Sequence, residues 1–291
     1  MSKNNPKNIA VSIRQKILNK ARSEKRPFGE LLQYYAMERF LYRLSVSKYS
    51  NKFILKGGLL FRVWDIDTSR PTMDIDMLGK TDNTKSNISK TIKEILLMTV
   101  EGDGIVFDFE SISTERIIAN ADYAGIRVSF KSLLGSAIVT IQLDIGFGDV
   151  TYPKPLKSNL NTILKDSASP VLYCYSKESC IAEKLQTMVK LQEINSRMKD
   201  FYDIWILIKK YDLDSNILTE AISKTFQQRD TVIPERIVAF SSEFVEEKQT
   251  QWKAFLRKQK LLFNIPDDFC EVIKSIKNTL EPILLDIKLI R

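Results

Sequence analysis

The spacing of apolar residues changes twice along the chain, and this change constrains the fold more than any other feature. Apolar residues recur at helical spacing over residues 8–22 and 29–46. Short segments with strand character follow up to residue 145, and helical spacing returns after residue 170. The pattern predicts an α+β protein. We expect an N-terminal domain over residues 1–152 that begins with two helices, followed by an all-α C-terminal domain over residues 171–291.

The expected strand over residues 137–145 is the most diagnostic segment. Val139, Ile141, Leu143 and Ile145 share one parity, and Asp144 lies on the other, polar parity. This alternation is typical of a strand with one buried face. The other expected strands cover residues 52–56, 74–78, 105–111 and 123–130, and an amphipathic helix covers residues 84–100.

The second half of the chain is expected to be helical. A Pro-, Ser- and Asn-rich segment over residues 152–170 predicts the connection between the two domains. The helices expected beyond it cover residues 177–192, 199–211, 214–227, 234–244, 249–259 and 267–284. Tyr34, Tyr35 and Trp64 lie at helical spacing in the first domain, which favours a place in the core over stacking on a nucleobase.

The sequence of 291 residues contains no histidine, which excludes several kinds of site. A Ser-His-Asp triad, a histidine general base and the HExxH and Cys₂His₂ zinc sites all require imidazole. Acid–base or metal chemistry must therefore use carboxylates, Lys, Tyr or Cys. The three scattered cysteines do not form a disulfide framework, and no segment resembles a signal peptide or a membrane span. We therefore expect a cytoplasmic protein.

The surplus of positive charge lies at the N-terminus. Residues 1–50 hold 11 Lys and Arg against three Glu, a net charge of +8, whereas residues 51–150 have a net charge of −3. A local basic surplus can attract a polyanion such as RNA. It can also form an ordinary solvated helix face, and the sequence leaves both interpretations open.

A pair of glycines and a pair of aspartates predict a phosphate and metal site. Gly57 and Gly58 follow an expected strand and allow backbone amides to approach a phosphate. Asp74 and Asp76 are two residues apart on a strand, so both point to one face and repel each other unless a cation lies between them. Mg²⁺ with substrate phosphates is the usual partner of such carboxylates.

A third carboxylate would complete a site for two Mg²⁺ ions, and Asp144 fits best because it lies on the polar parity of its strand. Asp149, Asp108 and Glu110 remain weaker alternatives. Such a site requires no histidine.

The stretch FILKGGLLFRVWDIDTSRPTMDID resembles the first motif of the nucleotidyltransferase superfamily of DNA polymerase β type. More narrowly, it resembles the AbiEii family, the toxin component of AbiE-type toxin–antitoxin and abortive phage infection systems. The stretch IAEKLQTMVKLQEINSRMKDFYDIW resembles the second motif of that family. The residues that carry the resemblance are Lys56, Gly57, Gly58, Arg70, Thr72, Asp74, Asp76, Lys184, Arg197, Lys199, Asp200 and Asp203.

The resemblance implies a nucleotidyltransferase fold, with a small mixed sheet flanked by helices and a C-terminal domain that contributes to the active-site cleft. It implies catalysis by Asp74, Asp76, Asp144 and Lys184, with the three aspartates as metal ligands. The nucleotide contacts that it implies come from Lys56, Gly57, Gly58, Arg70, Thr72, Lys199, Asp200 and Asp203. Leu59 stands where many members have Ser or Thr, and Thr72 replaces the commoner Ser.

The resemblance also implies an NTP co-substrate, a cognate antitoxin encoded nearby and an RNA acceptor such as the 3′ end of tRNA. Two rival interpretations remain. The chain could transfer a nucleotide to a small molecule, or it could be a non-catalytic module that binds RNA or protein. The carboxylates on matched strands favour the enzyme.

Overall fold

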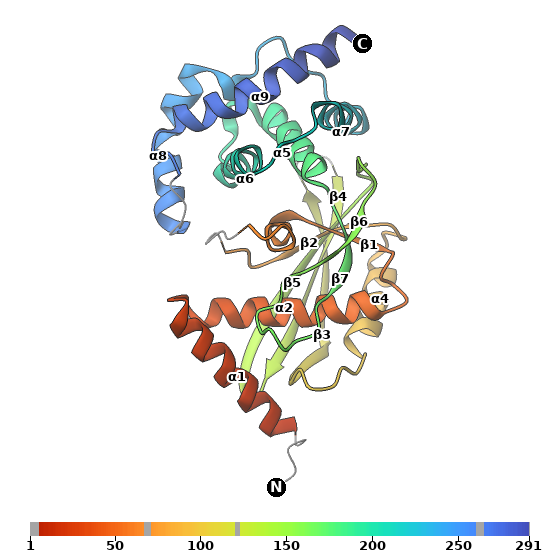
Figure 1. Ribbon diagram of the computed structural model, residues 1–291. Coiled ribbons are helices and arrows are strands. Elements are labelled where there is room, and N and C mark those ends of the chain that lie inside the picture. Colours follow the sequence, from red (N-terminus) through yellow and green to blue (C-terminus); the bar gives the residue numbers. More distant parts are fainter. Residues whose placement is uncertain (1–5, 67–70, 120–122, 260–264, 291) are drawn as a thin grey trace. The chain divides into compact units, whose positions relative to one another are not determined.

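The computed structural model describes residues 6–66, 71–119, 123–259 and 265–290 (Figure 1). The described chain forms two compact units. Unit 1 comprises residues 6–66, 71–148 and 156–174, and unit 2 comprises residues 149–155 and 175–290 within the described ranges. Each unit is described by itself below.

Within the described residues, unit 1 contains a mixed sheet of seven strands in the order β3-β4-β5-β2-β1-β7-β6. The neighbours β1 and β7 are parallel, as are β2 and β5, and the other pairs are antiparallel. This arrangement confirms the expected mixed sheet of an α+β protein. The strands are β1 (Phe53–Lys56), β2 (Ile75–Gly79), β3 (Ile105–Ala119), β4 (Tyr123–Leu134), β5 (Ala137–Phe147), β6 (Leu156–Asn159) and β7 (Val171–Cys174).

The helices of unit 1 are α1 (Pro6–Ser23), α2 (Phe28–Val46), the 3₁₀ turn η1 (Gly57–Leu59), α3 (Leu60–Val63) and α4 (Lys85–Leu96). α1 forms because Ile13, Ile17 and Ala21 recur every four residues and are all buried. The Thr84 hydroxyl caps α4 by accepting a hydrogen bond from the Asn87 N–H.

α2 packs on one face of the sheet, across β5 and β7 (Figure 1). The ring of its Phe40 lies 5.1 Å from the ring of Phe130 on β4. Phe130 is paired with Ile141 on β5. Residues paired across strands share a face, so the apolar parity of β5 faces α2. The polar parity with Asp144 therefore lies on the opposite face, and the alternation read from residues 137–145 is confirmed.

Unit 2 is built from helices around an aromatic core. The core includes Phe201 and Trp252, whose neighbour Phe269 lies 5.2 Å from each ring. The elements are α5 (Lys177–Leu191), η2 (Gln192–Ile194), α6 (Met198–Lys210), α7 (Ser215–Gln228), η3 (Val238–Phe240), α8 (Ser242–Gln259) and α9 (Phe269–Ile290). Among the helices that the structure describes, none is long and apolar enough to cross a membrane.

The structure differs from the sequence-based expectation in several segments. The expected helix over residues 84–100 ends at Leu96, and residues 171–174, expected within the all-α domain, form strand β7. The helix expected over residues 234–244 is wrong: α8 begins only at Ser242, after the Ser241 hydroxyl accepts a hydrogen bond from the Phe244 N–H. Serine is a favoured residue directly before a helix, because its hydroxyl can accept such a hydrogen bond. The expected connection over residues 152–170 contains strand β6, whose residues are mostly exposed and show no alternation that would predict a strand. β3 also continues to Ala119, well past residue 111.

Candidate active site

Five charged residues form a row across the polar face of the sheet. The register pairs Lys56 on β1 with Asp76 on β2, Asp76 with Asp144 on β5, Asp144 with Arg127 on β4, and Arg127 with Glu115 on β3. Residues opposite each other in a sheet point to the same face. The two adjacent carboxylates at the centre of the row therefore have a cation on either side.

Asp74 joins these two carboxylates to form a cluster. One oxygen of each of Asp74, Asp76 and Asp144 lies within 4.8 Å of the others, and all three residues are partly exposed. The Thr72 hydroxyl donates a 2.9 Å hydrogen bond to Oδ1 of Asp74, which fixes the orientation of that carboxylate. Three hard oxygen ligands at such a separation suit Mg²⁺, so the residues present fit the metal that the sequence predicts.

Gly57 makes the close approach of Asp76 feasible. Its φ of +71° lies in the left-handed region, and a Cβ atom at this position would lie 2.0 Å from Oδ2 of Asp76. Any other residue would displace the carboxylate. Glycine is therefore needed both for the left-handed backbone and for the space that the Asp76 carboxylate occupies. Gly57 and Gly58 open η1 directly after β1, as the sequence predicts.

Arg127 holds Asp144 with a two-pronged ion pair. Its Nε lies 2.8 Å from Oδ1 and its Nη2 lies 2.8 Å from Oδ2, with Glu115 3.7 Å from Nη1 on the other side. These hydrogen bonds raise the pKa of Arg127 above its ordinary value. Arg127 is not predictable from the sequence pattern, because only the register of β4 against β5 shows that it lies opposite Asp144.

Unit 2 contains a second charged cluster, centred on Lys184 of α5. Its ammonium group lies 2.7 Å from Asp200 and 2.9 Å from Asp203, both on α6 and both buried. Burial alone would lower the pKa of Lys184, but the charges of Asp200 and Asp203 outweigh it and raise that pKa. Asp203 is buried and bonded to Lys184, so its carboxylate does not lie on the surface of α6.

Arg70 and Lys199 are also predicted to contact the nucleotide. Arg70 lies outside the described residues. Lys199 is exposed at the start of α6. Of the alternative third carboxylates, Asp149 binds Arg229 at 2.9 Å and Glu110 binds Lys93 at 3.1 Å. Among the described residues, the group of carboxylates that could hold a metal ion contains Asp144 and none of these alternatives.

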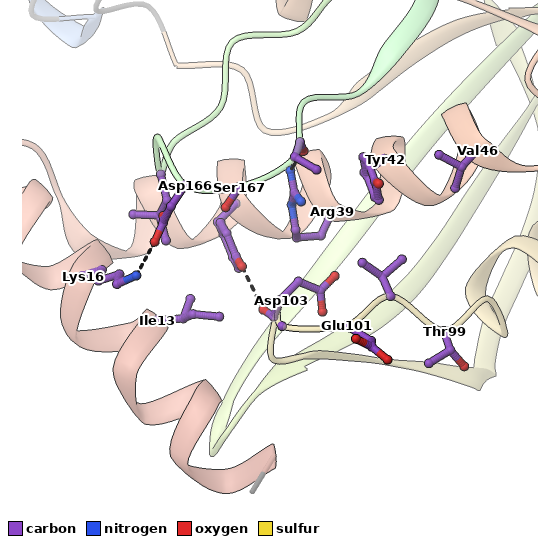
Figure 2. A pocket seen from close by; sticks show the side chains of 15 residues that line it. Ile13, Lys16, Arg39, Tyr42, Val46, Thr99, Glu101, Asp103, Asp166 and Ser167 are labelled. Carbon is purple, nitrogen blue, oxygen red and sulfur yellow. Dashed lines mark hydrogen bonds and ion pairs between the residues drawn. The ribbon is translucent and has the colours of Figure 1, made fainter. Parts of the chain in front are cut away.

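A separate cavity of about 470 Å³ lies between α1, α2 and the segments 99–103 and 164–168 (Figure 2). Lys16 and Asp166 form an ion pair at one side of it, and Asp103 lies on another side (Figure 2). The cavity borders α2, on the face of the sheet opposite the carboxylates. It is therefore distinct from the carboxylate cluster.

Glycines at a strand end and carboxylates on the adjacent parallel strands are features of nucleotidyltransferases, and the comparison with known families agrees. The family described as nucleotidyl transferase AbiEii toxin, type IV TA system, matches residues 39–275. The chain belongs to this family. It is a nucleotidyltransferase of the toxin family of a type IV toxin–antitoxin system, which implies an NTP substrate and an antitoxin partner.

Two solved structures from Helicobacter pylori are similar at 14% sequence identity. A candidate nucleotidyltransferase has a TM-score of 0.49, with 90% of this chain and 97% of that chain covered. The protein JHP933 has a TM-score of 0.48, with 89% and 93% covered. No curated protein matches the chain significantly. The assignment depends on the family match alone.

Proposed function

We propose that Asp74, Asp76 and Asp144 hold two Mg²⁺ ions and that the chain transfers a nucleoside monophosphate from an NTP to an acceptor hydroxyl. The observation that carries the proposal is the gathering of three carboxylate oxygens within 4.8 Å. When bound, Mg²⁺ neutralises the phosphate charge and favours loss of the acceptor proton. The family assignment supplies the reaction class.

The chain's own residues have distinct roles in this proposal. The acceptor oxygen forms a bond to the α-phosphorus, the bond from that phosphorus to pyrophosphate breaks, and pyrophosphate leaves. Asp144 accepts the proton of the acceptor hydroxyl. Lys56 and the backbone of Gly57 and Gly58 hold the triphosphate, because Lys56 pairs with Asp76 and the two glycines form the start of η1.

Lys184 and Arg70 are proposed to bind the triphosphate as well, on the strength of their match to the family motifs. Asp200 and Asp203 then orient Lys184, and their charges keep it protonated at neutral pH. Thr72 contributes through Asp74, the carboxylate to which its hydroxyl is bonded.

We further propose an RNA acceptor, such as the 3′ end of tRNA, and action in the cytoplasm. The net charge of +8 over residues 1–50 supports an RNA acceptor, because basic residues attract the phosphate backbone. Lys16 contacts Asp166, which lies outside residues 1–50 and offsets one of these charges, and Lys20 is paired with Glu24 within the region. Arg22 and Lys25 at the end of α1 are exposed and offer contacts to a phosphate backbone.

The reaction is tested with Mg²⁺, each labelled NTP in turn and total tRNA. The expected result is a labelled RNA band that disappears with Asp76→Asn and persists with Glu110→Gln, a carboxylate outside the cluster. Chelation of the metal should abolish labelling in the same way. Labelling of small molecules without any labelled RNA would indicate that the acceptor is a small molecule and not RNA. No labelling of any acceptor would refute the proposed reaction.

The RNA contact is tested by charge removal. Neutralising the exposed residues Arg14, Arg22 and Lys25 together should weaken tRNA binding and reduce its dependence on salt, because fewer counterions are released. The control removes three exposed lysines from the net-acidic region, which are Lys80, Lys85 and Lys90. Equal effects of the two triple variants would contradict a role for α1 in RNA binding.

A further inference from the structure

Two consecutive residues of α2 hold the backbone that leads to Asp74. The Thr72 N–H donates a 2.9 Å hydrogen bond to the hydroxyl oxygen of Tyr34. The side-chain amide of Gln33 donates a 3.2 Å hydrogen bond to the carbonyl of Met73. Both residues directly before Asp74 are therefore fixed from α2, on the face of the sheet opposite the carboxylates.

The same amide of Gln33 also reaches β5. Its Nε2 lies 3.1 Å from the carbonyl oxygen of Thr140, on the strand that carries Asp144. A single side chain thus connects the segment that carries Asp74 to the strand that carries Asp144. Gln33 is buried. Loss of the Gln33 amide would leave the carbonyls of Met73 and Thr140 without this hydrogen-bond donor, which is unfavourable.

A short hydrogen-bonded chain continues from Tyr34 to the carboxylate. Tyr34 binds the Thr72 N–H, and the Thr72 hydroxyl binds Oδ1 of Asp74 at 2.9 Å. The Tyr34 ring is itself held in place, with the guanidinium groups of Arg26 and Arg62 5.5 and 5.1 Å from its centre. Burial raises the pKa of Tyr34, so its hydroxyl remains neutral.

We infer that Gln33 and Tyr34 are positioning residues that set the separation of Asp74 and Asp144 for metal binding. Neither residue contacts a carboxylate, so both act through Thr72, Met73 and the backbone of β5. The inference rests on the proposed function, since it assumes that the three carboxylates bind a divalent cation. Groups that hydrogen-bond directly to metal ligands change metal affinity about 10- to 100-fold when they are replaced, so residues one hydrogen bond further away should act near the lower end of that range.

The test compares three near-isosteric variants of the full chain. Tyr34→Phe removes the acceptor of the Thr72 N–H, and Gln33→Met removes both amide hydrogen bonds. The matched control is Tyr35→Phe, which removes a buried 2.8 Å hydrogen bond from the next residue of α2 to the carbonyl of Asp103. Mn²⁺ affinity is measured by calorimetry without nucleotide, and thermal unfolding is measured in parallel.

Tyr34→Phe and Gln33→Met are each expected to weaken Mn²⁺ binding about tenfold, while Tyr35→Phe leaves it unchanged. The transfer reaction of the first two variants should need more metal and recover when metal is saturating. Unchanged Mn²⁺ affinity in both would overturn the inference, and so would an equal loss in Tyr35→Phe, which would indicate general destabilisation. Failure of the unaltered protein to bind Mn²⁺ would refute the proposed function, and the inference with it.

Discussion

Replacing Gly57 by alanine should disable the carboxylate cluster while the fold persists. The added Cβ would lie 2.0 Å from Oδ2 of Asp76, and real contacts of this kind are essentially never shorter than 3.0 Å. The carboxylate must therefore move by at least 1.0 Å, the difference between these two distances. A misplacement of about 1 Å at a reacting centre can lower the rate about 100-fold. The left-handed backbone adds about 1–2 kcal/mol of destabilisation.

Gly102→Ala is a matched control for this substitution. Gly102 has nearly the same φ, +76°, but no atom lies within 4 Å of the position that its Cβ would take. Both variants should lose a similar amount of stability in urea denaturation. Only Gly57→Ala should lose Mn²⁺ affinity and nucleotidyl transfer. If Gly57→Ala kept both at the level of Gly102→Ala, the close approach of Gly57 and Asp76 would have no functional meaning.

The charged residues and the thiols give four other predictions. Arg127→Gln should tighten Mn²⁺ binding several-fold in calorimetry, because one positive charge beside Asp144 is lost. Arg127→Lys keeps the charge and should change the Mn²⁺ affinity little. Weaker Mn²⁺ binding by the Gln variant would contradict this electrostatic effect. Lys184→Met should lower the free energy of unfolding by about 3–5 kcal/mol, because buried carboxylates lose their counterion, and a loss under 1 kcal/mol would argue against the pair. Burial alone would raise the pKa of Asp200, but the charges of Lys184 and Arg197 hold that pKa well below its ordinary value. This carboxylate therefore stabilises the fold above about pH 5 and loses that effect as the pH falls. Asp200→Asn should make the free energy of unfolding less dependent on pH in the acid range. Burial raises the pKa of Cys180 to about 12, so iodoacetamide at pH 8 should modify it only after unfolding, as mass spectrometry can show.

The sequence predicts those parts of the fold that have a local signal. The alternation of residues 137–145 identifies β5 and places Asp144 on the polar face, and the spacing of Asp74 and Asp76 indicates a shared face. β6 has no such signal, because an exposed edge strand needs no apolar parity and gains its pairing from β7.

The supporting residues of the site could not be predicted for a similar reason. Tyr34 has the helical spacing of a core residue and is indeed buried, yet its hydroxyl binds the backbone of a segment distant in sequence. Arg127 occupies an ordinary polar position in the alternating pattern of β4, so its sequence context does not indicate a contact with Asp144. Contacts that depend on strand register or on helix docking over a sheet are set by the whole fold, and short sequence patterns do not contain them.

The strand order has a consequence for how the protein folds. β2 and β5 are neighbours in the sheet, but the hairpin of β3 and β4 separates them in the sequence. Pairing of such distant strands is slow, because a long loop must close before any contact forms. Asp76 and Asp144 therefore meet only late in folding, and a growing chain cannot complete the cluster until β5 has been made. On the proposed mechanism, a newly synthesised chain would therefore gain transfer activity only after its sheet had closed.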